Sequence, residues 1–215
     1  MKGELDLTDA ALSLLAAYGV AALLLTITPG LDTALVLRTT SLDGRAKGFA
    51  AGLGIAVGCL IWGAAAAGGI ATLIAASPVA YDLIRYVGAA YLFYLGVRLI
   101  RNPGHGLPTP GSVGGGTRLG WFVRGVTGNV TNPKIGVFYA SFLPQFVPAG
   151  FAPGPTMLAL TLVHVVLGLF WTLFLVLASD RAARFLRKPG PALLIDRLTG
   201  GVFIAFGLRL ALDRR

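Results

Sequence analysis

Charged residues are scarce in this chain of 215 residues: they make up 13% of it, against about 25% in soluble domains. Cysteine and histidine are scarcer still. The single cysteine, Cys59, excludes an intrachain disulfide, a paired-cysteine redox site and a cysteine-based zinc site. The chain has only two histidines and no paired acids near them, so it lacks the residues that a hydrolase or a metalloprotease needs. We therefore expect a protein that is not an enzyme and that uses neither a metal nor a cofactor.

What the chain has in excess is hydrophobic sequence. Hydrophobic residues make up 55% of it and gather in six runs with almost no charge: Ala10–Thr28, Gly48–Ala76, Tyr86–Leu99, Trp121–Val147, Thr156–Ala178 and Leu198–Leu212. A helix needs about 20 residues to cross a bilayer, so four runs qualify alone. The third and sixth must recruit flanking residues, such as Val79–Arg85 and Leu193–Arg197. The expected fold is an all-α integral membrane protein with six transmembrane helices.

The net charge of +9 is explained by membrane topology and not by nucleic-acid binding. Twelve of the eighteen Lys and Arg residues lie in or beside three connections between the runs: Arg38, Arg45, Lys47; Arg98, Arg101, Arg118, Arg124; and Arg181, Arg184, Arg187, Lys188, Arg197. Basic residues favour the cytoplasmic side of a membrane. We expect the first, third and fifth connections to be cytoplasmic and both termini to lie outside. A protein with this membrane topology is also expected to contact membrane lipid.

Two of the helices are broken by proline at matching places in the two halves, at Thr28-Pro29-Gly30 and Asn132-Pro133-Lys134. Leu83–Leu99 also aligns without gaps against Leu194–Leu210. These matches predict two three-helix repeats, whose odd number of crossings makes them inverted, with broken first and fourth helices. The repeats are residues 1–102 and 118–215, and residues 103–117 form a cytoplasmic linker.

Proline breaks free backbone carbonyls, and such groups survive in a membrane where they are buried in protein or line a wet cavity. Asp32 follows the first break, where it could serve function or cap the half-helix that begins at Gly30. Lys134 opens the second half-helix, where the helix dipole disfavours a cation. Its partner could be Asp32 or a substrate carboxylate, or its side chain could extend to a membrane interface.

A carboxylate, an ammonium, amides and free backbone groups near two breaks suit a zwitterion such as an α-amino acid. The expected substrate-binding residues are Pro29, Gly30, Asp32, Asn129, Asn132, Pro133 and Lys134. For proton coupling the candidates are Asp32 and His164, although the alternative for His164, a neutral, hydrogen-bonded residue of the bundle, is favoured. Gly48, Gly52, Gly54 and Gly58 are expected to allow close helix approach.

Five elements, in order, resemble the LysE/RhtB family of amino-acid exporters. They are Pro29-Gly30-Leu31-Asp32, the loop around Gly44, Arg45 and Gly48, the string Gly88–Gly96, Asn132-Pro133-Lys134, and Phe142–Phe146. The one departure is Leu31, where the family usually has a second proline. The resemblance implies a bacterial inner-membrane exporter of amino acids or related metabolites, driven by the proton gradient and dimeric. The alternatives are export of another small metabolite, or a membrane subunit that transports nothing.

Overall fold

A computed structural model describes residues 2–70, 72, 77–102, 116–148, 150–179, 181 and 189–212. Within these ranges the chain is helical, and none of the described residues lies in a strand. The elements are α1 (Lys2–Ile27), α2 (Leu31–Asp43), α3 (Arg45–Ala65), the π-helical η1 (Ala66–Ile70), α5 (Pro78–Arg101), α6 (Arg118–Val130), α7 (Pro133–Val137), the π-helical η2 (Phe138–Phe142), the 3-10 helical η3 (Leu143–Phe146), α8 (Pro153–Leu177) and α10 (Pro189–Leu212).

Both expected helix breaks are present. The first interrupts the helix between Ile27 and Leu31, and the two helices on either side meet at a bend of 50°. The second falls between α6 and α7, at Thr131 and Asn132. Both prolines lack the N–H that would continue the preceding helix. Pro133 also occupies the first turn of α7, to which its fixed backbone angle is suited, whereas Pro29 precedes the N-cap residue of α2, Gly30.

The short hydrophobic runs recruit their neighbours as expected. The third run lies within α5, which begins at Pro78, and the sixth lies within α10, which begins at Pro189. By length and composition, Arg45–Gly69 and Pro153–Leu177 could each span a membrane, and the bent pair formed by α1 and α2 makes a third candidate span. The all-helical membrane fold is therefore confirmed at this coarse level, and the count of six crossings stays a prediction.

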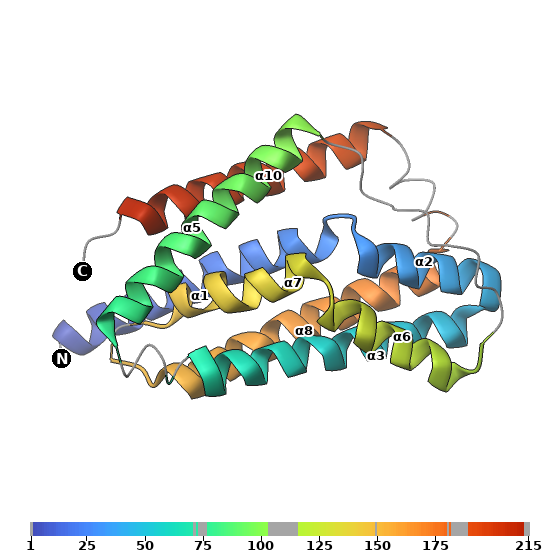
Figure 1. The fold of residues 1–215 in the computed structure, drawn as a ribbon, viewed down its shortest axis with the longest axis horizontal. Helices are drawn as coiled ribbons and strands as arrows, with labels where there is room; N and C mark the ends of the chain where they lie inside the picture. Colours follow the sequence, from blue (N-terminus) through green and yellow to red (C-terminus); the bar gives the residue numbers. More distant parts are fainter. Residues whose placement is uncertain are drawn as a thin grey trace.

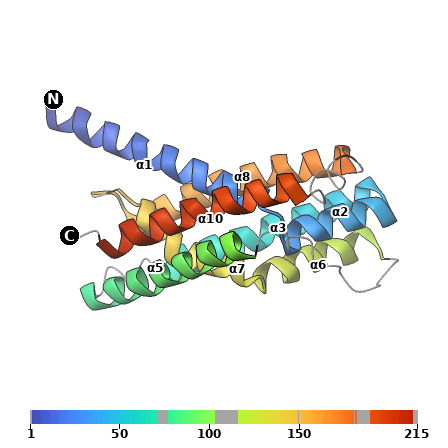
Figure 2. The same ribbon diagram turned by 90° about the horizontal axis from the view of Figure 1, so that it is seen from above.

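The connections sort to two ends of the molecule. Figure 1 shows the turn between α2 and α3, the start of α6 and the end of α8 together at one end, and the N-terminus and C-terminus at the other. Figures 1 and 2 both show α5 and α10 side by side and antiparallel. Most of the expected linker, residues 103–115, lies outside the described residues.

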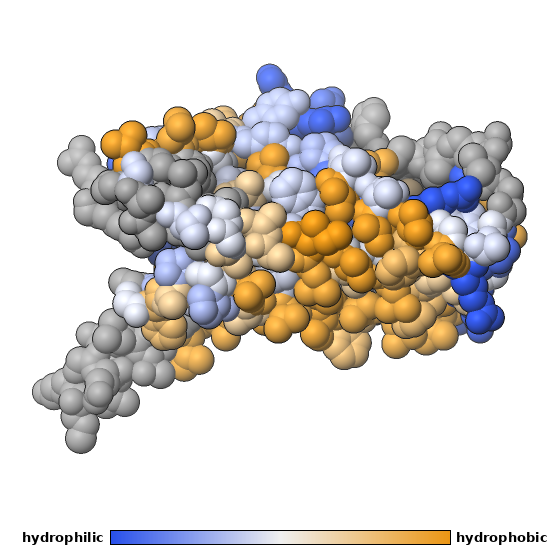
Figure 3. Space-filling model, turned by 60° about the horizontal axis from the view of Figure 1, so that its bottom comes forward, coloured by the Kyte–Doolittle hydropathy of each residue, from blue (hydrophilic) through white to orange (hydrophobic). Residues whose placement is uncertain are grey.

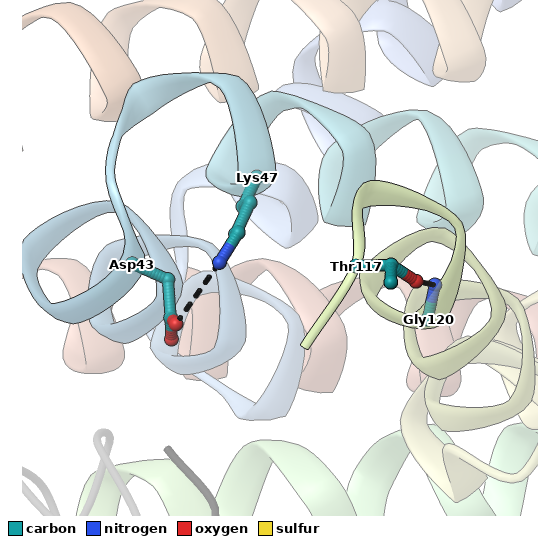
Figure 4. Close-up of polar contacts among 4 residues, drawn as sticks. All are labelled: Asp43, Lys47, Thr117 and Gly120. Atoms are coloured by element: carbon teal, nitrogen blue, oxygen red, sulfur yellow. Dashed lines mark hydrogen bonds and ion pairs between the residues drawn. The ribbon is translucent and has the colours of Figure 1, made fainter. Parts of the chain in front are cut away.

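Small polar contacts mark the end of the molecule that carries the α2–α3 turn. Lys47 approaches Asp43 across this turn at 3.5 Å, and Thr117 caps α6 by accepting a hydrogen bond from the Gly120 amide at 3.0 Å (Figure 4). In a space-filling view, hydrophilic residues lie at this end and along the upper edge of the molecule, and hydrophobic residues cover the lower middle (Figure 3). The hydrophobic area is a surface suited to contact with lipid.

One face of α8 is a continuous hydrophobic stripe that is largely exposed. Its exposed members recur every three or four residues: Leu158, Leu162, Val166, Phe170, Leu173, Phe174 and Leu177. Phe170 is 68% exposed, which in water would be costly for a residue of this size. The stripe is the surface expected of a helix that contacts lipid acyl chains.

Where helices pack against one another inside the protein, several approach closely at glycine positions. An added Cβ at Gly48, Gly52, Gly54 or Gly58 would collide with Thr40, Thr172, Phe122 or Asn129 respectively. The four glycines of α3 thus seat it against α2, α8 and α6, which confirms the expectation of close approach. Glycines also bring α5 and α10 together, because a Cβ at Gly96 would meet the Gly200 carbonyl at 2.6 Å. Tight packing of α3 is what fixes the walls of the site described next.

Candidate functional site

The ammonium of Lys134 ends at the first helix break. Its Nζ donates to the carbonyl of Leu25 at 3.0 Å and to the carbonyl of Thr28 at 3.2 Å. The Leu25 carbonyl is the one that would have bonded to residue 29, which is Pro29 and has no N–H. Lys134 therefore supplies the hydrogen bond that the proline removes, at the negative end of the α1 dipole. The interpretation that Lys134 extends to a membrane interface is wrong, since its charge is held inside the protein.

The second break is closed by the side chain of Asn132. This residue is the N-cap of α7, with its Oδ1 accepting a hydrogen bond from the Lys134 amide at 3.1 Å, and Pro133 occupies the first helical position. Asparagine is a favoured N-cap and proline a favoured first residue, so the local sequence dictates this turn. As a result the Lys134 backbone is anchored at one break while its side chain is anchored at the other.

The Asp32 carboxylate lies in the first turn of α2 and accepts a hydrogen bond from Asn129 Nδ2 at 2.9 Å. The alternative that Asp32 caps α2 is wrong, because the N-cap position is Gly30, where no side-chain cap is made. Asp32 still gains from the positive end of the α2 dipole. Its hydrogen bond to Asn129 joins it to the helix before the second break, across 97 residues of sequence.

These groups share one internal cavity of about 70 Å³. A water molecule needs roughly 10–15 Å³ on this measure, so the cavity has room for a few. Asp32, Asn132 and Lys134 line its polar side. Away from the breaks the lining is mainly hydrophobic and comes from α2, α3 and α8: Val36, Ile55, Ala56, Val165, Trp171 and Leu175. The cavity thus has a charged end and a hydrophobic end.

His164 also lines this cavity, and it is buried. Its Nδ1 shares a hydrogen bond of 2.9 Å with the hydroxyl of Tyr139. The structure therefore places the predicted histidine at the site, in contact with a buried partner. This geometry is compatible with both interpretations of His164, as a proton relay and as a satisfied bundle residue.

The structure brings together every predicted binding residue, in two layers. Asp32, Gly30, Asn132 and Lys134 line the cavity itself. Asn129 lies behind Asp32, fully buried, and acts on the cavity through its hydrogen bond to that carboxylate. Pro29 contributes by the backbone carbonyl that it frees, and Pro133 by starting the first turn of α7.

The sequence did not identify the hydrophobic end of the cavity or the contact with α10. Thr28 Oγ1 and Thr199 Oγ1 share a hydrogen bond of 2.7 Å, which ties α10 to the first break. Trp171 lines the hydrophobic end, and its indole N–H donates to Thr33 at 3.3 Å. A polar residue inside an apolar helix, such as Thr199, is a usable signal, but threonine is too common in membrane helices for it to stand out.

Taken together, these features define a class of protein: a helical membrane protein with a polar cavity at two helix breaks, as in secondary transporters. Among the described residues, no group of three His, Cys, Asp or Glu side chains could hold a metal ion.

Comparison with known proteins identifies the family. Residues 23–214 match the LysE type translocator family, and the chain belongs to it. The chain is therefore a multi-pass membrane translocator and not an enzyme. It is 32% identical to the leucine efflux protein of Klebsiella pneumoniae, over 90% of this chain and 92% of that protein. It is 31% identical to the leucine efflux protein of an Enterobacter strain, over 90% and 93%. An uncharacterized membrane protein of Bacillus subtilis is 29% identical, over 94% and 99%. No solved structure matches the chain.

Proposed function

We propose that this protein is a secondary transporter that exports amino acids or close derivatives across the bacterial cytoplasmic membrane. The observation that carries the proposal is the position of Lys134, whose ammonium reaches from the second break to the carbonyls of the first and lies beside a cavity that also contains Asp32. Opposite charges at one end of a cavity are what a zwitterion requires. Relatives named leucine efflux proteins, which align over nearly their whole length, support the same substrate class.

The cavity suggests how an amino acid binds. The substrate carboxylate would approach the Lys134 ammonium, and the substrate ammonium would approach Asp32. The substrate side chain would then extend between α3 and α8, toward Ile55 and Leu175. At about 70 Å³ the cavity must widen to admit a whole leucine, as expected of a transporter that alternates between conformations.

We further propose six crossings arranged as two inverted repeats. In this arrangement α1 and α2 together form one broken helix, and α6 and α7 form the other. The third helix of the first repeat is α5 and that of the second is α10, and these two helices pack against each other. The α2–α3 turn and the start of α6, whose sequences contain Arg45, Lys47 and Arg118, lie at one end of the molecule (Figure 1), which supports a cytoplasmic position for that end and an outer position for both termini. The cavity lies between the breaks and this end, so the described conformation would be the one that receives substrate from the cytoplasm.

Coupling to the proton gradient is part of the proposal, with Asp32 and His164 as the candidate proton carriers. Both line the cavity, so a proton held by either would be close to the substrate charges. Association as a homodimer and contact with membrane lipid complete the proposal; the exposed hydrophobic stripe of α8 supports the latter.

The test is to measure extracellular amino acids by mass spectrometry, in cells fed dipeptides with and without this protein. Three variants would run beside the wild type: Lys134→Gln, Asn132→Ala and, as a matched lysine control, Lys47→Gln, which lies at the surface beside Asp43. We expect one or a few amino acids to appear faster outside the cells, and this gain to be lost in Lys134→Gln and Asn132→Ala only.

Two other results would contradict the proposal. If no amino acid appears faster while the protein is present in the membrane, the substrate is another small metabolite or the protein transports nothing. If Lys134→Gln exports like the wild type, the ammonium at the breaks has no part in binding.

A further inference from the structure

A cluster of aromatic rings fills the protein between the helix breaks and the end of the molecule that holds the termini. Phe138, Phe142 and Phe146 recur every four residues along η2 and η3, where the chain runs from α7 toward that end (Figure 1), and each is between 1% and 3% exposed. Phe142 lies at the centre, with ring centroids 5.0 Å from Phe138 and 4.7 Å from Phe146. Two rings of α10 complete the cluster, Phe206 at 5.1 Å and Phe203 at 6.5 Å from Phe142.

These rings form the wall of the substrate cavity on this side. His164, which lines the cavity, packs against Phe138 with ring centroids 5.2 Å apart. Ile135 also lines the cavity and belongs to the same buried hydrophobic cluster as the rings. Tyr18 of α1 packs against Phe146 at 5.3 Å. A zwitterion that leaves the cavity toward the termini must cross the space that these rings fill, and its charges would lose their hydration there.

The segment that carries three of the rings is an irregular helix. In the π-helical η2 the Leu143 amide donates to the carbonyl of Phe138, five residues back, and η3 continues as a 3-10 helix. Pro144 accounts for the change, because it has no N–H and its ring crowds the carbonyl four residues back. Such turns inside a helix are frequent at functional sites and hinges.

An open apolar groove of about 630 Å³ borders the other face of this segment. Ala140 and Ser141 line the groove on the side turned away from Phe142, and α5 lines it with residues that include Val87, which is 60% exposed. The segment touches α5 at Gly88, where an added Cβ would collide with Ser141. Beside this contact the groove leaves space, so a shift of the segment toward it would part the rings without forcing another helix through the core.

We propose that the segment Phe138–Phe146 is the outer gate of the transporter, with Phe142 as its central residue. In the described conformation the rings close the cavity toward the termini, and movement of the segment toward the groove opens it. The closure is a property of the fold alone, whereas the release of an amino acid past the rings rests on the proposed function.

The single cysteine of the chain provides a test that needs no transport, because Cys59 is buried and lines the cavity. A charged thiol reagent that does not cross membranes is added to intact cells, and its rate of reaction with Cys59 is measured by mass spectrometry of the purified chain. In the wild type the rings keep the reagent out, so we expect Phe142→Ala to raise this rate at least tenfold. An unchanged rate, with Phe142→Ala present in the membrane, would overturn the closure of the cavity by these rings.

Two control variants separate loss of the barrier from a general loosening of the fold. Leu37→Ala also truncates a buried side chain, but one in a separate hydrophobic cluster formed by α2 and the end of α8. Phe170→Ala removes a ring that is 68% exposed on α8. Both should react at the wild-type rate, and an equal rise in Leu37→Ala would overturn the assignment of the barrier to the rings. If Phe142→Ala does not reach the membrane, Phe142→Leu takes its place, because leucine removes the ring and keeps more of the volume.

Pro144→Ala tests the movement through the export assay. Alanine restores the missing N–H and favours an α-helix, so the segment loses the cause of its irregular turn while every ring is kept. We expect maximal export to fall at least tenfold, with the melting midpoint of the purified chain unchanged or higher and Cys59 still reacting at the wild-type rate. Wild-type export, or a loss of export that comes with a lower midpoint, would overturn the movement. If the wild type exports no amino acid, the proposed function fails, while the reaction of Cys59 still decides whether the rings close the cavity.

Discussion

The hydrophobic end of the cavity should determine which amino acid is exported, and Gly168 is the residue through which this can be tested. It lies in the middle of α8 and lines the cavity, and a Cβ built at this position would have no atom within 4 Å. An added side chain would therefore enter the cavity without displacing protein. Replacing glycine by alanine inside a helix also favours the helix by about 1 kcal/mol, so the fold should not suffer.

The size of the effect follows from the volume lost. An added methyl group removes space that a large aliphatic substrate needs and a small one does not. Excluding one methylene from a hydrophobic pocket is worth about 1–3 kcal/mol, or roughly 10–200-fold in discrimination. We expect Gly168→Ala to lower leucine export at least tenfold relative to alanine export, and Gly168→Leu to stop leucine export.

A single dipeptide, alanyl-leucine, provides the assay, because its hydrolysis in the cell releases both amino acids in equal amounts. The ratio of extracellular leucine to alanine then reports selectivity and cancels differences in expression. Gly201→Ala is the matched control, since it too lies in a helix with no atom within 4 Å of its added Cβ, but it does not line the cavity. An unchanged ratio in Gly168→Ala and Gly168→Leu would refute the assignment of this end to the substrate side chain.

Two further predictions concern the groups that hold the breaks. Gly58→Ala should lower export at least tenfold, because its Cβ would collide with Asn129, which positions the Asp32 carboxylate; Gly69→Ala, with nothing within 4 Å, should export normally and so provides the control. Thr28→Val should remove the hydrogen bond to Thr199, a loss of about 1 kcal/mol, and lower the melting midpoint of the purified protein by roughly 2–4 °C. Normal export by Gly58→Ala, or an unchanged midpoint in Thr28→Val, would contradict the respective contact.

Much of the site could be predicted because proline and charge are strong signals in a hydrophobic sequence. Pro29 and Pro133 mark the breaks, and the structure has them there. Lys134 was recognised as a cation that needs a negative partner. Its partners could not be chosen from the sequence, because the acceptors that it found are backbone carbonyls 109 and 106 residues away, and carbonyls carry no sequence signature.

The hydrophobic end of the cavity could not be predicted for a different reason. Val36, Ile55 and Leu175 look like any other apolar residue of a membrane helix, and only the packing of α3 against α2 and α8 decides that they face a cavity. The glycines of α3 were a partial signal, since they predicted close approach but not the partner helix. Asp196 could in principle be noticed as an acid in an apolar stretch, yet its burial follows only from the fold.

The two breaks satisfy one another, and this explains why a cation at the start of a half-helix is tolerated. The dipole of α7 disfavours the Lys134 charge, but the side chain carries that charge to the carbonyl end of α1, where the dipole favours it. In return, Asn129 of the second half donates a hydrogen bond to the Asp32 carboxylate of the first. Hydrogen bonds to charged groups contribute about 1.5–3 kcal/mol each, so separating the halves has a substantial energetic cost. Any ligand that replaces these bonds with its own carboxylate and ammonium lowers that cost, and a zwitterion is therefore suited to trigger movement of one half against the other.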